Sequence, residues 1–335
     1  MRGPCTFGSM IALGLDVGGA NVKAATADGR AWGEPFALWK HPDGLAAVLA
    51  ETIARFPDAE ALAVTMTGEL CDCYVTKREG VNRILDAVEA AADGRPIRVW
   101  STVGRFVPVT EAREQHLKVA SANWHALATY VARFVRPGIG LLIDIGSTTT
   151  DLILLANGQP VARGRTDPER LRSGELVYTG VRRTPVFALI PDHTAAEFFA
   201  TMHDVYLVLG MVDQDATDTD TADGRPATVA YANARLARVL GGDADTVSSA
   251  DVIALARQTY AAQREKIVAA AHRQLEGQTA EFVISSGGGE FLARAIVADI
   301  ASSAKVISLS DQLGPKASFC APAFACAVLA TEAES

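Results

Sequence analysis

The sequence predicts an α/β protein made of two copies of one domain, with a ligand site in the cleft between them. The first observation behind this prediction is a repeat, because residues 11–29 and 141–154 both read as strand, polar turn and strand. The second is a hairpin signal that follows each copy. The third is a strand, a glycine turn and a helix at residues 281–297. An internal repeat is the signature of a duplicated architecture, so the first two observations predict a duplicated domain.

Both copies end their first strand in an aspartate and turn on a glycine two residues later. Asp16 aligns with Asp144, and the copies keep a constant offset of 128 positions. The second copy fills its turn with hydroxyl side chains, which are poor helix formers and suit a turn that holds a ligand. The aligned positions are Gly18 and Gly146, residues 19–22 and 147–150, and Lys23 and Asp151.

Each repeat then continues into a hairpin. Asp28-Gly29 and Asn157-Gly158 are Asx-Gly pairs, which favour tight turns because both central residues need positive φ. A third strand is expected after each pair, at residues 30–39 and 159–164. The sequence therefore predicts the same three-strand meander twice.

Helices and strands alternate through the rest of the chain, and Pro137-Gly138 marks the predicted domain boundary. The first domain is expected to span residues 10–136 and the second residues 137–335, each with a mixed five-stranded sheet covered by helices. A mostly helical insertion is expected at residues 166–242, with an acidic, solvated loop at 213–224. The other expected elements are helices at 43–56, 79–92 and 249–275 and strands at 60–66 and 96–101.

Length and composition restrict the function. A chain of 335 residues is long for one hydrophobic core, which favours two domains. The formal net charge of −8 argues against a nucleic-acid partner, because phosphate backbones need a basic face. No apolar run of about 18 residues occurs, so we expect no membrane association, and five cysteines without disulfide or zinc spacing fit the reducing cytoplasm. The expected partner is a small phosphorylated substrate, and formation of a homo-oligomer is left open.

The two turns are predicted to bind phosphate. Backbone N–H groups of such turns point into one concavity and bind anionic oxygens, and hydroxyls add donors. Asp16 and Asp144, at the strand ends, are expected to hold Mg²⁺, usually through water. The alternative is a pair of ordinary hairpins with satisfied polar turns, which two copies in register make the weaker interpretation. The predicted phosphate-binding residues are Gly18, Gly19, Asn21, Lys23, Gly146, Ser147, Thr148 and Thr149.

A third turn, at residues 285–290, carries three glycines between a strand and a helix. Glycines allow close backbone approach, and the N-terminus of the following helix favours an anion. Neither the P-loop pattern nor the dinucleotide-binding pattern is present. The predicted nucleotide-binding residues of this turn are Gly287, Gly288 and Gly289.

Together these motifs resemble a known superfamily. Two matched aspartate–glycine turns, followed by a strand, three glycines and a helix, are similar to the sugar kinase and actin superfamily, whose duplicated actin-like ATPase domains have a ribonuclease H-like fold. Four longer segments resemble the hydantoinase/oxoprolinase-like branch, and within it the proteins of tetrahydromethanopterin-linked C1 transfer and methanofuran biosynthesis. These segments are residues 144–153, 163–186, 197–210 and 221–226.

The resemblance implies an ether-forming transferase. It would join an aminomethyl-furanmethyl diphosphate to γ-glutamyltyramine and release diphosphate. The phenol of tyramine has a pKa near 10, so a base assists its attack. Glu69 follows the strand predicted at residues 60–66 and is the first candidate base, because ligands of open α/β sheets sit beyond the carboxyl ends of strands. Capping of the following segment is the alternative for Glu69, and Asp72 and Asp151 are the next candidates.

A diphosphate leaving group also needs cations to spread its charge. Lys23 is the candidate from the first domain, and Arg182 and Arg183 are the candidates from the second, since a guanidinium binds phosphate in a bidentate way. Surface salt bridges are the alternative for the two arginines.

Two other functions fit the same motifs. One is a small-molecule kinase of the same pathway, with ATP in the cleft and Glu69 or Asp151 as the base. The other is an ATP-driven activator that clamps a partner protein. Mg²⁺ is the expected cofactor, and the sequence leaves open whether ATP binds. It also leaves open whether the pairs Cys71/Cys73 and His193/Glu197 bind metal, because neither has a third ligand at diagnostic spacing.

Overall fold

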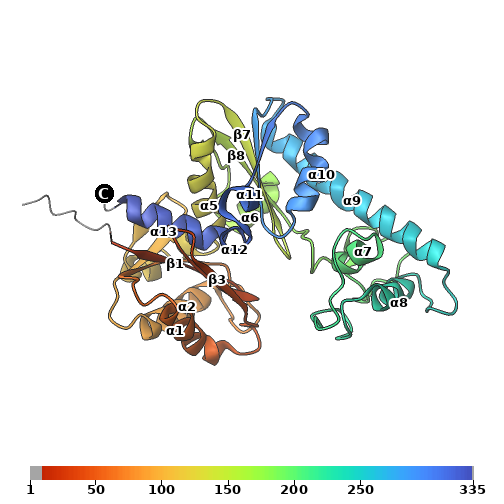
Figure 1. Cartoon of the computed structure of the whole chain (residues 1–335), viewed down its shortest axis with the longest axis horizontal. Coiled ribbons are helices and arrows are strands. Elements are labelled where there is room, and N and C mark those ends of the chain that lie inside the picture. The colour runs from red at the N-terminus through yellow and green to blue at the C-terminus, as the bar shows by residue number, and fades with distance from the viewer. Residues whose placement is uncertain (1–9, 334–335) are drawn as a thin grey trace, which may run out of the picture.

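The computed structural model describes residues 10–333, which form two α/β lobes with one mixed sheet each (Figure 1). The strand order is β3-β2-β1-β4-β5-β6 in the first lobe and β10-β8-β7-β11-β12 in the second, where β9 also pairs with β8. The strands of the first lobe are β1 (Ala12–Val17), β2 (Asn21–Thr26), β3 (Ala31–Pro35), β4 (Ala61–Met66), β5 (Ile97–Ser101) and β6 (Arg105–Val107). The strands of the second lobe are β7 (Ile139–Ile145), β8 (Thr150–Ala156), β9 (Gln159–Pro160), β10 (Leu176–Val177), β11 (Phe282–Ser286) and β12 (Lys305–Ser308).

Helices cover both sheets, and α5 and α13 pack between them. In the first half they are α1 (Leu45–Ala54), α2 (Lys77–Ala91), α3 (Val109–Glu114), α4 (His116–Val119) and α5 (Asn123–Val131). In the second half they are α6 (Asp167–Ser173), α7 (Met202–Val208), α8 (Val229–Val239), α9 (Ser249–Leu275), α10 (Glu290–Ala301), α11 (Leu309–Leu313), α12 (Pro315–Phe319) and α13 (Ala321–Ala333). Short 3₁₀ turns lie at Pro42–Gly44, Ala132–Phe134 and Val186–Ala188. None of the described helices has the length and apolar character needed to span a bilayer.

The repeat read from the sequence is present in three dimensions. The antiparallel register pairs Asp16 with Lys23 in the first lobe and Asp144 with Asp151 in the second. One backbone hydrogen bond closes each turn, at 3.0 and 2.9 Å. The bonded pairs are Gly18 N–H with the oxygen of Asn21 and Gly146 N–H with the oxygen of Thr149. The offset of 128 positions therefore relates backbone geometry as well as residue types, and the prediction of a duplicated hairpin is confirmed.

Several predicted elements form for the reasons read from the sequence. The strand β4 is buried throughout and apolar except for Thr65, as expected for a central strand between parallel neighbours. The helices α2 and α9 begin after Thr76 and Ser248, whose side chains accept hydrogen bonds from the backbone N–H three residues later. These three elements start and end within about two residues of the expected positions, which is the usual scatter of boundaries.

The third strand of the second meander differs from the prediction. The expected strand at residues 159–164 contains only the two-residue β9, and β10 forms the sheet edge beside β8. The buried carboxylate of Glu175 explains this difference, because it accepts hydrogen bonds from the N–H groups of Arg163 and Gly164 at 2.7 and 2.8 Å. Those N–H groups are satisfied by a side chain and do not need a strand partner. Each sheet thus has six strands where five were expected.

The insertion at residues 166–242 is less helical than predicted. It holds α6, α7 and α8, joined by irregular segments. A small apolar cluster packs α7 and α8 against α9, and these helices lie beside the end of α9 that is far from the first lobe (Figure 1). The loop at 213–224, expected to be solvated, uses its aspartates to bind arginines, with Asp223 contacting the buried Arg235 at 2.9 Å.

The last helix returns to the first lobe. Although α13 follows the second sheet in the sequence, it packs across β1, β2 and β4 and against α5 (Figure 1). One apolar cluster runs from these strands through α5 and α13 to Leu142 and Ile153 of the second sheet. The chain therefore passes from the first lobe to the second at the predicted boundary, residue 137. It returns to the first lobe with α13, which completes the core of that lobe.

Replacing Gly14 with valine should destabilise the protein. A Cβ atom at Gly14 would lie 1.8 Å from the carbonyl oxygen of Ala323 in α13, so the helix would have to move away from β1. We expect a loss of at least about 1–3 kcal/mol of unfolding free energy, the usual cost of overpacking. Urea denaturation measures this loss. Gly44→Ala is the control, since a Cβ there meets only the Phe36 ring at 3.7 Å, and equal stability of the two variants would contradict the packing described.

Candidate active site

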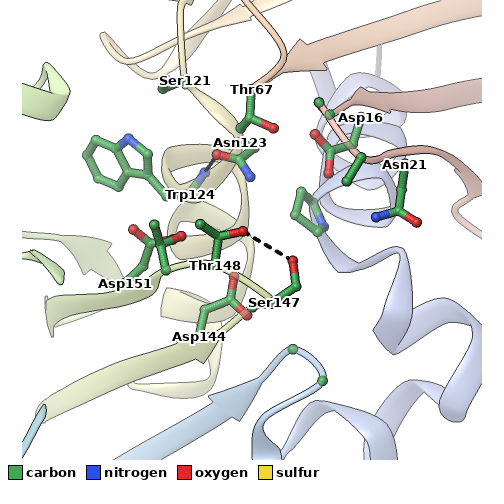
Figure 2. Close-up of a pocket in the computed structure, with 18 of the residues that line it drawn as sticks. Asp16, Asn21, Thr67, Ser121, Asn123, Trp124, Asp144, Ser147, Thr148 and Asp151 are labelled. Atoms are coloured by element: carbon green, nitrogen blue, oxygen red, sulfur yellow. Dashed lines mark hydrogen bonds between the residues drawn. The ribbon is translucent and has the colours of Figure 1, made fainter. Parts of the chain in front are cut away.

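A cavity of about 550 Å³ lies between the two lobes. Its walls come from the carboxyl ends of β1, β4, β7 and β11, where ligands of open α/β sheets bind. Figure 2 shows Asp16, Asn21 and Thr67 from the first lobe around the same space as Asp144 and Ser147 from the second. Most of the predicted site residues line it, namely Asp16, Gly18, Gly19, Asn21, Lys23, Asp144, Gly146, Ser147, Thr148, Thr149, Asp151, Arg182, Arg183, Gly287 and Gly288.

Three predicted residues lie outside the cavity wall. Gly289 precedes α10 and packs on Ile145, because a Cβ there would be 2.4 Å from an Ile145 methyl group. Asp72 is exposed on the surface. Glu69 follows β4 as expected, yet its side chain has no exposed area. The expectation that Glu69 or Asp72 contacts a substrate directly is therefore not met in this structure.

The two strand-end aspartates sit deep in the cavity. Burial raises the pKa of Asp16, and the charge of Lys23 opposes that shift. Burial raises the pKa of Asp144 to about 7, with a further contribution from the charge of Asp151. One carboxylate oxygen of Asp16 is buried without a hydrogen-bond partner. Buried polar atoms are normally satisfied, so this oxygen is an available ligand.

Asp16 and Asp144 fit Mg²⁺ in their chemistry. Carboxylate oxygens are its preferred ligands, and the ion keeps several waters, so it needs few protein groups. Within residues 10–333 no group of three His, Cys, Asp or Glu side chains converges as a metal site. The pairs Cys71/Cys73 and His193/Glu197 thus gain no third ligand of these types from the fold, and burial raises the pKa of the Cys71 thiol to about 11.

In metal-free protein, Asp144 should make stability fall as pH rises. Its pKa is about 7 in the folded state and about 4 in the unfolded chain, so between these values the folded state holds the proton that the unfolded state has lost. This contribution to the unfolding free energy is complete below about pH 4 and disappears as pH rises through about 7. Urea denaturation with a chelator, at about pH 5 and about pH 8, should show it, and Asp144→Asn should reduce the difference. An equal difference in both proteins would contradict this assignment.

The three predicted cations all line the cavity, but they differ in their partners. The Lys23 ammonium lies 4.3 Å from the centre of the Phe319 ring. Arg183, from the second lobe, lies over the Trp39 ring of the first lobe at 4.9 Å. Arg182 forms ion pairs with Asp218 and Asp220. Lys23 and Arg183 have no carboxylate partner among the ion pairs found within residues 10–333, whereas Arg182 is already neutralised.

The cavity is also lined by a second group of polar residues, and the sequence patterns did not indicate this group. Arg170 is almost fully buried, and its guanidinium binds Asp151 at 2.7 Å and lies 3.9 Å from the centre of the Trp124 ring. Burial raises the pKa of Asp151, and Arg170 opposes that shift. The signal that could have revealed this helix is the capping box of Thr166 and Glu169 at the start of α6.

Glu69, Lys77, Ser121 and Asp167 form one cluster at the cavity wall. Ser121 and Asp167 line the cavity, and Glu69 lies behind them. The Ser121 hydroxyl is 2.7 Å from Glu69 Oε1 and 2.9 Å from Asp167 Oδ2. The Lys77 ammonium is 2.6 Å from Asp167 Oδ2 and 3.6 Å from Glu69 Oε1. The cluster joins the lobes, because Lys77 begins α2 and Asp167 begins α6.

Comparison with known proteins shows similarity along nearly the whole chain. A family model described as hydantoinase/oxoprolinase matches residues 60–333. The chain is 33% identical over 329 residues to (4-{4-[2-(gamma-L-glutamylamino)ethyl]phenoxymethyl}furan-2-yl)methanamine synthase of Methanocaldococcus jannaschii, covering 95% of this chain and 96% of that protein. A protein of the same name from Methanococcus vannielii is 29% identical over 211 residues, covering 59% of this chain and 95% of that protein.

Solved structures agree on the fold. Acetone carboxylase in its nucleotide-free form superposes with a TM-score of 0.54 at 12% identity, over 95% of this chain and 70% of that chain. The PilM–PilN complex of type IV pilus biogenesis gives a TM-score of 0.51 at 12% identity, over 96% of this chain and 98% of that one. At such identities the likeness concerns architecture alone, and it confirms the predicted class of duplicated actin-like ATPase domains.

Proposed function

This chain belongs to the hydantoinase/oxoprolinase family, where it is similar over its length to a furan-methanamine synthase, and we propose that it forms the ether bond of a methanofuran-type cofactor. The name of that relative describes a product in which the phenol oxygen of γ-glutamyltyramine is bonded to a methylene carbon on a furan ring. The proposed substrates are γ-glutamyltyramine and an aminomethyl-furanmethyl diphosphate. The products are the ether and free diphosphate.

The observation that carries this proposal is that two chemically different sets of residues line one cavity. Paired turns from both lobes form one set, whose backbone and hydroxyl donors suit a diphosphate. The other set includes Asp151, Asp167 and the half-exposed ring of Tyr178, which suit an aromatic acceptor that must lose a proton. A reaction between a diphosphate ester and a phenol needs both sets in one site.

The residues present can assist each bond change. Lys23 and Arg183 stabilise negative charge as it develops on the departing diphosphate. Asp16 and Asp144 would hold Mg²⁺, which supplies further positive charge for the leaving group when it is bound. The two turns orient the diphosphate so that its methylene carbon faces the acceptor, and a carboxylate removes the phenol proton.

Product analysis tests this function directly. The purified protein is incubated with the furan diphosphate, γ-glutamyltyramine and Mg²⁺ without ATP, and mass spectrometry and a diphosphate assay follow the products. We expect the ether and diphosphate in equal amounts. Failure to form the ether with both substrates present would reject the proposal.

A kinase reaction is the second candidate, and one observation favours it. Gly287 and Gly288, in the third turn, also line the cavity. The backbone of this turn therefore offers an additional binding surface for a substrate with more than two phosphate groups. A parallel incubation with γ-labelled ATP separates the two functions. Transfer of label to the furan alcohol or another small acceptor would support the kinase, whereas ether formation without ATP would exclude a requirement for it.

A further inference from the structure

We propose that Asp167 is the general base that removes the phenol proton, and that Ser121 connects it to Glu69, which shares the proton. This inference rests on the ether-forming function proposed above. It replaces the prediction that Glu69 meets the substrate itself, because Asp167 lines the cavity and Glu69 does not.

The geometry of Ser121 is the first argument. Its hydroxyl lies within hydrogen-bond distance of a carboxylate oxygen on each side, at 2.7 Å from Glu69 and 2.9 Å from Asp167. A hydroxyl has one proton to donate and also accepts hydrogen bonds. Both contacts are therefore strong at the same time when one of the two carboxyl groups carries a proton and donates it to the Ser121 oxygen. The arrangement holds one proton between two acids and can move it from one end to the other.

The charge of the cluster is the second argument. Two carboxylates face one ammonium, so the unprotonated cluster has a net charge of −1 at a site that is largely buried. A buried charge without a partner is costly, and uptake of one proton makes the cluster neutral. Burial raises the pKa of Glu69, although Lys77 and Ser121 oppose that shift, and one oxygen of Glu69 has no hydrogen-bond partner. Glu69 is thus suited to share a proton that enters at Asp167.

The position of Asp167 relative to the acceptor surface is the third argument. Tyr178 lines the cavity with 54% of its area exposed, and the charges of Asp167, Lys77 and Glu69 act on its phenol. An exposed ring beside the cluster is a packing surface for the phenyl ring of an acceptor. Asp151 also lines the cavity and also pairs with a cation, but among the described residues it has no hydroxyl link to a second carboxyl group like the one that Ser121 gives Asp167. Asp72 is exposed and does not line the cavity.

The proposed step balances in atoms and charge. The phenol O–H bond breaks and its proton passes to a carboxylate oxygen of Asp167. The phenolate oxygen forms a bond to the methylene carbon of the furan substrate, and the bond from that carbon to the diphosphate oxygen breaks. The electron pair of the broken bond leaves with diphosphate. The proton is then shared among Asp167, Ser121 and Glu69 until product release returns it to water.

Steady-state kinetics with two acceptors tests the proposal. The variants are Asp167→Asn, Ser121→Ala and Glu69→Gln, with Glu51→Gln on the exposed side of α1 as a control expected to match the wild type. With γ-glutamyltyramine, Asp167→Asn should lower kcat by about 10²–10⁴-fold with little change in KM, the usual effect of removing a general base. With a ring-fluorinated acceptor, whose phenol is more acidic, the loss should shrink.

The roles of Glu69 and Ser121 need a measurement that would not change if these residues only supported the fold. Glu69→Gln removes a negative charge beside Asp167, so the acidic limb of the kcat/KM profile should shift to lower pH. The charged and titratable groups that face Asp167 in this comparison are Lys77 from α2, Glu69 after β4, Asp151 from β8 and Tyr178 after β10. Ser121→Ala should reduce kcat without raising KM for either substrate.

Several outcomes would overturn the proposal. If the wild-type protein forms the ether and Asp167→Asn retains full kcat, Asp167 is not the base, and the proposed function is unaffected. A rise in KM with an equal loss for both acceptors assigns Asp167 to binding. If circular dichroism shows that Asp167→Asn is poorly folded, Asp167→Glu is measured in its place. A rate of Asp167→Glu that does not depend on the acidity of the acceptor phenol would also reject Asp167 as the base. Wild-type protein that forms no ether rejects the proposed function itself.

Discussion

Alanine at Asp16 or at Asp144 should lower the rate of ether formation by about 10³-fold or more, since a bound cation and its ligands contribute several kcal/mol of charge stabilisation to the transition state. Both aspartates occupy matched strand ends, and an oxygen of Asp16 is buried without a partner. Isothermal titration with Mg-diphosphate should show weakened binding in each variant.

The control for this experiment is Asp43→Ala, which removes an exposed carboxylate from the same lobe. The fold should survive in both active-site variants, because each removes a buried carboxylate that costs stability when it lacks a cation. Retention of wild-type affinity for Mg-diphosphate in both variants would reject the phosphate site formed by the paired turns.

Replacing Arg170 with methionine should destabilise the protein by about 3–5 kcal/mol, the usual cost of breaking a buried ion pair from one side. Arg170 is 1% exposed, binds Asp151 at 2.7 Å and packs on Trp124, so methionine keeps much of the volume and leaves Asp151 without its cation. Urea denaturation measures the loss from the transition midpoint and slope.

A double variant separates charge from packing at this position. Adding Asp151→Asn to Arg170→Met removes the uncompensated carboxylate, so much of the lost stability should return. If the stability lost by the double variant equals the sum of the losses in the two single variants, the contact between the two side chains contributes nothing. Packing on Trp124 then accounts for the whole effect.

The paired turns were predictable because their geometry is local. A strand, a glycine and a short polar turn determine a backbone path within a few residues, and the repeat at 128 positions supplied the second copy. The same reasoning placed Glu69 correctly beyond the end of β4. It could not give the burial of the side chain, which is bound by Lys77 and by the cavity-lining Ser121 and has no exposed area.

The Asp167 cluster was not predictable from local patterns. Ser121 lies 52 positions from Glu69 within the first lobe, and Lys77 lies 90 positions from Asp167 of the second lobe, so the cluster is complete only after the lobes have docked. Ser121 also has a φ of 48°, in the left-handed region that serine rarely adopts, and no glycine or asparagine marks that position in the sequence. Sequence reasoning therefore found the groups that local motifs carry, Glu69 among them, and missed the partners that long-range contacts bring to Glu69.

The return of α13 to the first sheet has a consequence for the order in which the protein is made. A ribosome releases β1, β2 and β4 early, yet the alanine-rich face that includes Ala12 and Ala63 is covered by the helix at Ala321–Ala333. The first lobe can therefore begin to fold during translation but cannot close its core until α13 has emerged. Nascent chains stalled before residue 321 should expose that face to chaperones and proteases, while the same chains extended through α13 should resist digestion.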